Sequence, residues 1–338
     1  MSSMKILSLN ALSVNVINDE PIALTMRNGS LTLSYLDIDL GKVIDLARFN
    51  GSIGFILGIG DRYLVSVDNN LYLMEEHKGK LVLKASNPKN FFWHAIKAEG
   101  RIFVHEYGEA PTGIYVSEDL EDWKRLITNM EIDRSSKHFH SIAYDAYRRW
   151  LITTLGDGCL TRAAYSEDLG NTWKPLYKGP WQFVPIEVLE DRIVFGMDSG
   201  IVRGGVGIYY PGEGRWDFIF LRWYDANVGF AQISELKLLD NGIWMAALGA
   251  PQAFLVSKDL KTWCVAHIEG FDPNFNYHVS IAEGKDIVIG STGENLIIFD
   301  KKELTDLARN CTIAMASYKP TLIERLKGYG FSIKRMFI

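Results

Sequence analysis

The segment 138–158, HFHSIAYDAYRRWLITTLGDG, holds residue types that can transfer protons or bind a metal ion. His138 and His140 are two positions apart, so on a β-strand their side chains face the same side. Two imidazoles and the carboxylate of Asp157 would suit a divalent cation. We expect no other cofactor. The alternative interpretation is that one of these histidines only caps the start of a strand.

A second segment, YSEDLGNTWKPL (165–176), indicates the elements that must position such residues. The hydroxyl of Ser166 and the carboxylate of Asp168 can accept hydrogen bonds from backbone N–H groups that a tight turn leaves unpaired. Gly170 can adopt a positive φ, and Trp173 is expected to bury its ring in the next strand. We therefore interpret Asp168 as a brace of the turn. The order of these residues resembles the Asp box of sialidase-like β-propellers.

The same turn recurs along the chain, as VSEDLEDW (116–123) and VSKDLKTW (256–263), with fainter equivalents elsewhere. Short runs rich in β-branched and aromatic residues precede each copy, and recurrence every 40 to 50 residues or so is typical of propeller blades. The repeats predict one all-β domain, a seven-bladed β-propeller over residues 1–317, with the N-terminal MKILSLNAL strand completing the last blade; six blades with an N-terminal extension are the alternative. The repeated turns are expected near residues 34, 73, 116, 165, 210, 256 and 299.

A second resemblance is to a BNR-repeat family of the sialidase superfamily, which is associated with carbohydrates and mostly without assigned chemistry. The segment 138–158 resembles its H-x-H…D-x-Y…T-T-G-D block, with Leu155 inserted, and EDRIVFGMDSG (190–200) resembles its F-G-x-D-S element. The matching positions are His138, His140, Asp145, Tyr147, Gly156, Asp157, Gly196, Asp198 and Ser199.

In propellers of this kind, the first strands of the blades start, and the second strands end, at one common opening. The resemblance thus implies that His140 acts there as a general acid or base, or as a ligand-orienting donor, with Asp157 as its orienter. Asp145 and Tyr147 are expected in a turn on the opposite face, with structural roles. The residues expected to bind substrate are His94, Tyr107, His138, Asp198, Arg203, Gln232, Tyr277 and His278.

Two classes of function fit this opening. A glycan-degrading enzyme would be a polysaccharide lyase or a glycoside hydrolase acting on an oligo- or polysaccharide, acidic if Arg203 faces it. A true sialidase is disfavoured, because the early blades lack an R-I-P motif and no set of three arginines is evident. A non-catalytic glycan- or protein-binding scaffold is the alternative. We expect a carbohydrate-recognising propeller whose catalysis is open.

Composition narrows the choice of partners and compartment. The net charge of −5 argues against non-specific binding to nucleic acids. The three cysteines are far apart and predict neither a disulfide framework nor a structural zinc site. A convincing signal peptide and a long apolar run are both lacking, so a cytoplasmic protein without a transmembrane segment is expected.

Residues 318–338 are expected to form an amphipathic C-terminal tail. Thr321 and Glu324 predict a capping box, and an apolar face follows on Leu322, Ile323 and Leu326. The tail could dock on the propeller, on a second copy of the chain or on a membrane surface.

Overall fold

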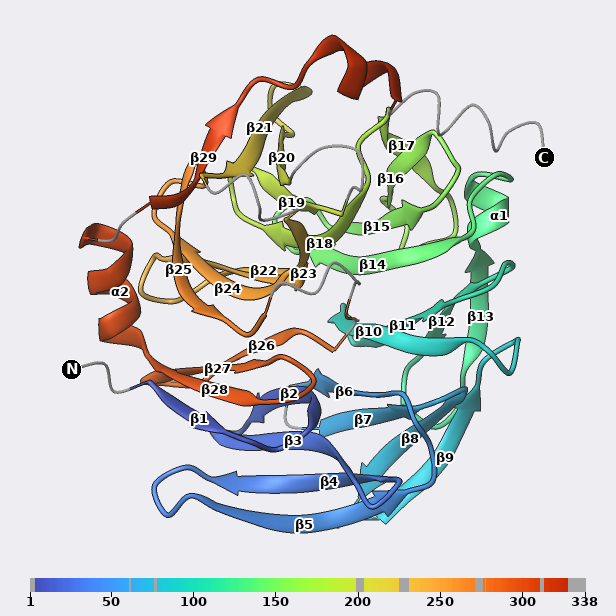
Figure 1. Ribbon diagram of the computed structural model, residues 1–338. Helices are drawn as coiled ribbons and strands as arrows, with labels where there is room; N and C mark the ends of the chain where they lie inside the picture. The colour runs from blue at the N-terminus through green and yellow to red at the C-terminus, as the bar shows by residue number, and fades with distance from the viewer. Residues whose placement is uncertain are drawn as a thin grey trace. The chain divides into compact units, whose positions relative to one another are not determined.

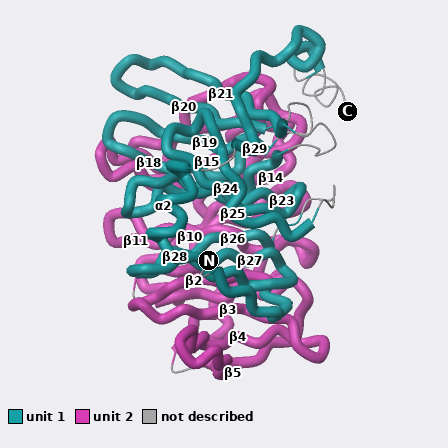
Figure 2. The backbone as a smooth tube through the Cα atoms, turned by 60° about the vertical axis from the view of Figure 1, so that its left-hand side comes forward, with its two compact units in different colours: residues 1–11, 183–328 teal, residues 12–182, 329–338 magenta. Residues whose placement is uncertain are grey.

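The computed structural model describes residues 4–60, 62–75, 78–198, 204–224, 231–270, 276, 278–310 and 313–327. Antiparallel strands dominate these residues, as the alternating sequence pattern predicts (Figure 1). The chain divides into two compact units, coloured separately in Figure 2. The all-β prediction is confirmed.

One unit, which contains residues 12–182, consists of four sheets, each of four strands in chain order. The strands are β2 (Ala11–Ile17), β3 (Glu20–Arg27), β4 (Ser30–Asp37) and β5 (Lys42–Phe49); β6 (Gly54–Ile59), β7 (Arg62–Val67), β8 (Asn70–Glu75) and β9 (Lys78–Lys84); β10 (Phe91–Ala98), β11 (Arg101–Tyr107), β12 (Gly113–Ser117) and β13 (Lys124–Thr128); and β14 (His138–Asp145), β15 (Trp150–Gly156), β16 (Thr161–Ser166) and β17 (Lys174–Lys178). A short helix, α1 (Asn129–Ile132), follows β13.

The other unit contains the described residues 4–11 and 183–327. Its largest sheet has the order β18-β19-β20-β21-β29-β25-β24-β23-β22, so β29 joins two groups of four strands. The strands are β18 (Phe183–Val188), β19 (Ile193–Met197), β20 (Gly205–Tyr210), β21 (Arg215–Trp223), β22 (Gln232–Leu238), β23 (Trp244–Ala250), β24 (Gln252–Ser257), β25 (Thr262–Ile268) and β29 (Ile313–Tyr318).

A smaller sheet of this unit pairs the N-terminal strand β1 (Lys5–Leu7) with β28 (Leu296–Asp300), followed by β27 (Ile287–Ser291) and β26 (Ser280–Glu283). This pairing confirms the expectation that the MKILSLNAL segment completes the last sheet. Ile6 lies opposite Ile297 in the register. β28 thereby pairs with a strand nearly 300 positions away in the sequence, and β1 becomes the edge strand of this sheet.

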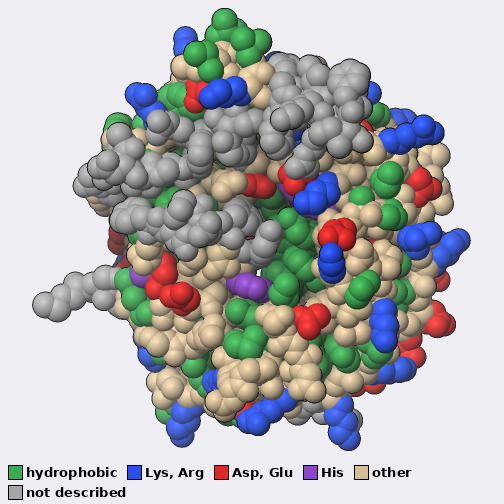
Figure 3. All heavy atoms as spheres, turned by 45° about the vertical axis from the view of Figure 1, so that its right-hand side comes forward, with side chains coloured by type: hydrophobic (Ala, Val, Ile, Leu, Met, Phe, Trp, Pro, Cys, Tyr) green, Lys and Arg blue, Asp and Glu red, His purple; other side chains and the backbone are tan. Residues whose placement is uncertain are grey.

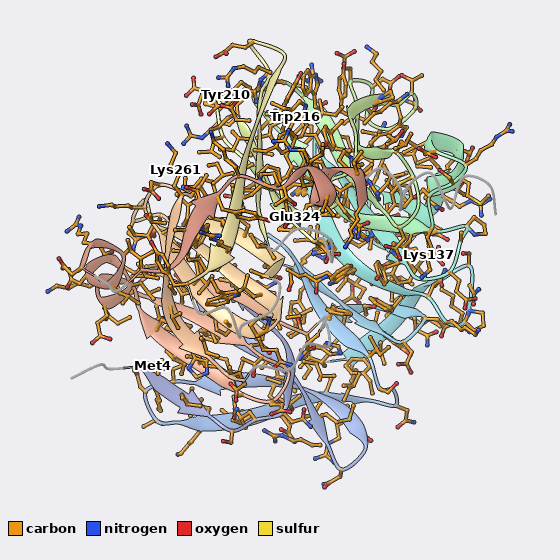
Figure 4. The ribbon with its side chains drawn as sticks, turned by 45° about the horizontal axis from the view of Figure 1, so that its top comes forward. Met4, Lys137, Tyr210, Trp216, Lys261 and Glu324 are labelled. Carbon is orange, nitrogen blue, oxygen red and sulfur yellow. The ribbon has the colours of Figure 1, made fainter. Side chains whose placement is uncertain are left out.

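The seven turn positions expected from the sequence fall in, or at the end of, β4, β8, β12, β16, β20, β24 and β28. These are every fourth strand of the chain, so the period of the repeat is that of a four-stranded unit. The cores between sheets are apolar, as in the cluster that includes Phe103, Phe139 and Leu151. Figure 4 labels Tyr210 and Trp216 in the β20–β21 hairpin, where Trp216 stacks on Phe218.

The turn after β16 has the bonds that its sequence predicts. Asp168 accepts from the backbone N–H of Thr172 (2.8 Å) and Ser166 Oγ accepts from that of Gly170 (2.7 Å), while the indole of Trp173 donates to the Gly170 carbonyl. Gly170 has φ +94°. The role of Asp168 as a turn brace is confirmed, but the ring of Trp173 is only half-buried.

The two shorter copies of the turn repeat this network. In the turn after β24, the backbone N–H of Leu260 donates to Ser257 Oγ, and the indole of Trp263 donates to the Leu260 carbonyl. Leu120 and Leu260 adopt positive φ where the glycine is missing. Asp145 is similarly structural, because it accepts hydrogen bonds from the backbone of Tyr147 and Arg148.

The C-terminal part contains α2 (Lys301–Asn310), strand β29 and a helical turn at 322–327. The predicted capping box is present, with Thr321 and Glu324 bonded to each other, and Leu322, Ile323 and Leu326 are exposed. In the described part of the chain, every helix is too short or too polar to cross a lipid bilayer.

The cysteine expectation needs one correction. Cys264 is disulfide-bonded, whereas Cys159 is a buried free thiol. Wide spacing in the sequence does not exclude a disulfide, because folding can bring distant strands together.

Candidate functional site

Histidines gather where two neighbouring sheets of the 12–182 unit begin. His138 opens β14 and pairs with Gly156 at the end of β15, while His94 on β10 pairs with His105 on β11. Both first strands contain a register shift, between Phe139 and Ser141 and between Phe92 and His94. His140 is therefore the extra residue of a β-bulge, a feature that re-aims side chains.

The rings of His138 and His140 meet edge to edge. Their Nε2 atoms are 3.1 Å apart, and Nδ1 of His138 lies 2.8 Å from the carbonyl oxygen of Gly108. The His140 ring lies over Gly156, where any Cβ would overlap its Nε2. Both histidines are only 2% exposed.

On the face shown in Figure 3, basic and acidic side chains are interspersed and histidine appears only in small patches.

Asp157 completes this group, because its carboxylate and the nitrogens of His138 and His140 all lie within 4.8 Å of one another. It follows β15 directly, with φ +47°. Its backbone N–H donates to Oε1 of Gln182 (3.2 Å), which also accepts from the buried guanidinium of Arg162. The expected proximity of His140 and Asp157 is thus present in the structure.

The ammonium group of Lys137 lies beside this group. Nζ of Lys137 is 3.7 Å from Oδ2 of Asp157, and Figure 4 labels Lys137, the residue before β14. Both side chains are partly exposed, so the pair contributes little to stability but supplies positive charge at the accessible edge of the cluster.

Burial disfavours the charged form of His138, His94 and His105. It lowers the pKa of His138 to about 3, with repulsion from His140 as the second cause, and lowers the pKa of His94 to about 4. Burial also places the pKa of His105 well below its usual range. At neutral pH these rings therefore present lone pairs and N–H donors. A weakly basic imidazole such as His138 suits hydrogen bonding or metal binding better than proton abstraction.

The other substrate-binding residues predicted in this unit lie close by. The ring of Tyr107 is 4.1 Å from that of His138 and 6.0 Å from that of His140, centroid to centroid. The His94 ring is hydrogen-bonded to the backbone of His140, and its Nδ1 is 3.0 Å from Nε2 of His105. The structure thus brings His94, Tyr107, His138, His140 and Asp157 together.

In the other unit, Gln232 Nε2 donates to Oδ1 of Asp198 at 2.8 Å, so two predicted residues contact each other. The backbone N–H of His278 donates to Asn276. Arg203 and Tyr277 lie outside the described residues.

Sequence reasoning missed several partners of the cluster. His105, Gln182 and Arg162 have no signal of their own, because each acts through contacts between strands. Gly156 was visible as a family match, yet its role depends on the bulge that brings the His140 ring over it.

Comparison with known proteins establishes the class of fold. Neither a protein-family model nor a curated protein matches this sequence. Virginiamycin B lyase from Staphylococcus aureus is similar in structure, with a TM-score of 0.63 and 10% identity over 88% of this chain and 99% of that one. The fold is of the β-propeller type.

Two further propeller structures support this conclusion. YCF48 from Cyanidioschyzon merolae has a TM-score of 0.57 and 14% identity over 89% of this chain and 99% of that one. Oligogalacturonate lyase in complex with manganese has a TM-score of 0.56 and 9% identity over 90% and 100%. At these identities the likeness extends to the fold alone.

Proposed function

We propose that the protein is a seven-bladed β-propeller that recognises a carbohydrate at the cluster of His138, His140 and Asp157. The blade count is supported by seven groups of four strands: β2–β5, β6–β9, β10–β13, β14–β17, β18–β21, β22–β25, and β26–β28 with β1. In this assignment, β29 is an addition that bridges the fifth and sixth groups.

The observation that carries the functional proposal is the packing of Tyr107 against the two histidines beside Asp157. An aromatic ring next to imidazoles and a carboxylate offers a stacking surface together with hydrogen-bond donors and acceptors, which is what a sugar ring requires. Lys137 at the edge favours a sugar that carries an acidic group.

Glycan degradation is the catalytic form of this proposal. His140 would act as general acid or base with Asp157 as its orienter, in a polysaccharide lyase or a glycoside hydrolase rather than a true sialidase. The burial of both histidines, each 2% exposed, favours the second candidate, a non-catalytic glycan- or protein-binding scaffold.

The test is a binding and turnover screen of the full chain against acidic and neutral polysaccharides, including polygalacturonate. Binding is measured by calorimetry, and lyase products by absorbance near about 235 nm, because proton abstraction leaves a conjugated double bond. His140→Ala should abolish binding or turnover, whereas His267→Ala, which removes a histidine paired with Glu269, should not. Equal glycan binding by both variants would contradict the proposal, and binding without turnover would support the scaffold.

A further inference from the structure

The tautomer of His138 follows from its hydrogen bonds. Its Nδ1 lies 2.8 Å from the Gly108 carbonyl, which can only accept, so Nδ1 carries the proton. In the neutral ring, Nε2 then presents its lone pair toward His140. A histidine that donates from one nitrogen to a backbone carbonyl and offers the other is the usual arrangement of a metal ligand.

The spacing of the two imidazoles fits a shared ion. Two nitrogens that bind one Zn²⁺ at about 2.1 Å, with an angle of about 90° to 109° at the ion, are roughly 3.0 to 3.4 Å apart. The Nε2 atoms of His138 and His140 are 3.1 Å apart. This separation arises from the bulge at His140 and from Gly156, whose missing side chain leaves room for the ring.

The carboxylate of Asp157 supplies an oxygen to the same space, and neighbouring residues fix the position of Asp157. Its backbone N–H donates to Gln182, which Arg162 anchors at 3.1 Å; Arg162 is 1% exposed and also donates to the carbonyl of Gly179. Such a supporting layer, which fixes a ligand without touching the ion, is characteristic of built metal sites.

We propose that His138, His140 and Asp157 bind one divalent transition-metal ion. Two imidazoles and one carboxylate favour Zn²⁺, Mn²⁺, Fe²⁺ or Co²⁺ over Mg²⁺ and Ca²⁺, which prefer oxygen ligands alone. Three protein ligands leave coordination positions for water or a ligand oxygen.

The competing arrangement is a metal-free pair, in which Nε2–H of His140 donates to Nε2 of His138. It explains the same 3.1 Å distance. The two arrangements differ in their dependence on Asp157, because a hydrogen-bonded histidine pair has no need of a carboxylate.

The experiment uses the full chain without an affinity tag, stripped with EDTA and dialysed. Calorimetric titration with Zn²⁺ should show one site per chain, and Co²⁺ should give visible absorption bands. Asp157→Asn should weaken Zn²⁺ binding by about 10-fold or more, and His140→Ala by about 100-fold or more. Asparagine tolerates the left-handed backbone at position 157, so this variant should fold.

His267→Ala is the matched control, since His267 forms a histidine–carboxylate pair with Glu269 in the other unit. It should leave Zn²⁺ binding unchanged. Failure of the wild-type chain to bind Zn²⁺ or Co²⁺, or equal binding by Asp157→Asn, overturns the metal site. No sugar is present in this titration, so its result is independent of the proposed carbohydrate function.

Discussion

The serine–aspartate–tryptophan turns and the histidine cluster are both rich in polar groups, but they are built differently. In the turn after β16, the bonds join residues no more than four positions apart. In the cluster, His138 contacts the backbone 30 positions away and Asp157 contacts Gln182 25 positions away. Local hydrogen bonds satisfy the polar groups of a turn from within the turn, whereas the cluster forms only where separate strands meet.

The two regions also differ in what their surroundings do to the pKa values of their ionisable groups. Backbone N–H donors, those of Thr172 first, lower the pKa of Asp168 to about 2, so its charge is favoured. Burial lowers the pKa of His138 and His105, so their charge is disfavoured. A buried neutral histidine adds less to stability than an apolar residue of its size, which directs attention to function in the cluster and to folding in the turns.

The largest expected effect separates two copies of the turn. Trp263 is fully buried in the core with Leu255 and Met315, whereas Trp173 is half-buried. Trp263→Ala should lower the free energy of unfolding by about 3 to 5 kcal/mol, and Trp173→Ala by about half as much or less, because less apolar area is lost. Urea denaturation measures both. Equal losses of unfolding free energy would mean that the shared turn structure, and not the burial of the indole ring, determines the destabilisation.

A pair of glycine substitutions separates a site glycine from a turn glycine. Gly156→Ala places a Cβ against the His140 ring, and Gly170→Ala places one against Leu126 at a positive φ. Each should destabilise the fold by about 1 to 3 kcal/mol. Gly156→Ala should also abolish Zn²⁺ and glycan binding, whereas Gly170→Ala should leave both intact, as calorimetry on the folded variants would reveal. Loss of Zn²⁺ and glycan binding in both variants would contradict the expectation that only the cluster, and not the turn, contributes to binding.

The smallest expected effect is a difference in pH dependence, measured in EDTA by urea denaturation. The folded pKa of His105 lies below its unfolded value of about 6.5, so the unfolded state binds more protons as pH falls from about 6.5. His105 therefore costs stability progressively on acidification, by at most about 1.4 kcal/mol per pH unit. The difference in stability between wild type and His105→Gln should accordingly shrink between pH 7 and pH 5.

A turn carboxylate provides the comparison. The stability that Asp168 contributes is present above its unfolded pKa of about 3.8 and is lost only as pH falls toward 2, so the effect of Asp168→Ala should be constant between pH 7 and pH 5. A constant difference for His105→Gln as well would show that His105 is not buried in its neutral form.

Much of the fold could be predicted from the sequence, because its signals are local. The Ser166–Trp173 turn contains its own hydrogen-bond partners, and its recurrence gave the position of every fourth strand. The half-burial of Trp173 could not be predicted, since the same motif buries Trp263 completely. Depth in a core depends on the neighbouring sheet, which a repeat motif does not encode.

The sequence by itself determined the alternation of short strands and turns, the residue types of the site, and the same-side spacing of His138 and His140. Only the tertiary structure decided that a bulge brings His140 over Gly156, that His105 pairs with His94, and that Arg162 and Gln182 hold Asp157. The physical reason is the sequence separation of the residues in contact. Turn bonds are fixed within a few residues, whereas the geometry of the cluster is set by register between strands and by packing between sheets, where a shift of one residue would turn each side chain to the other face.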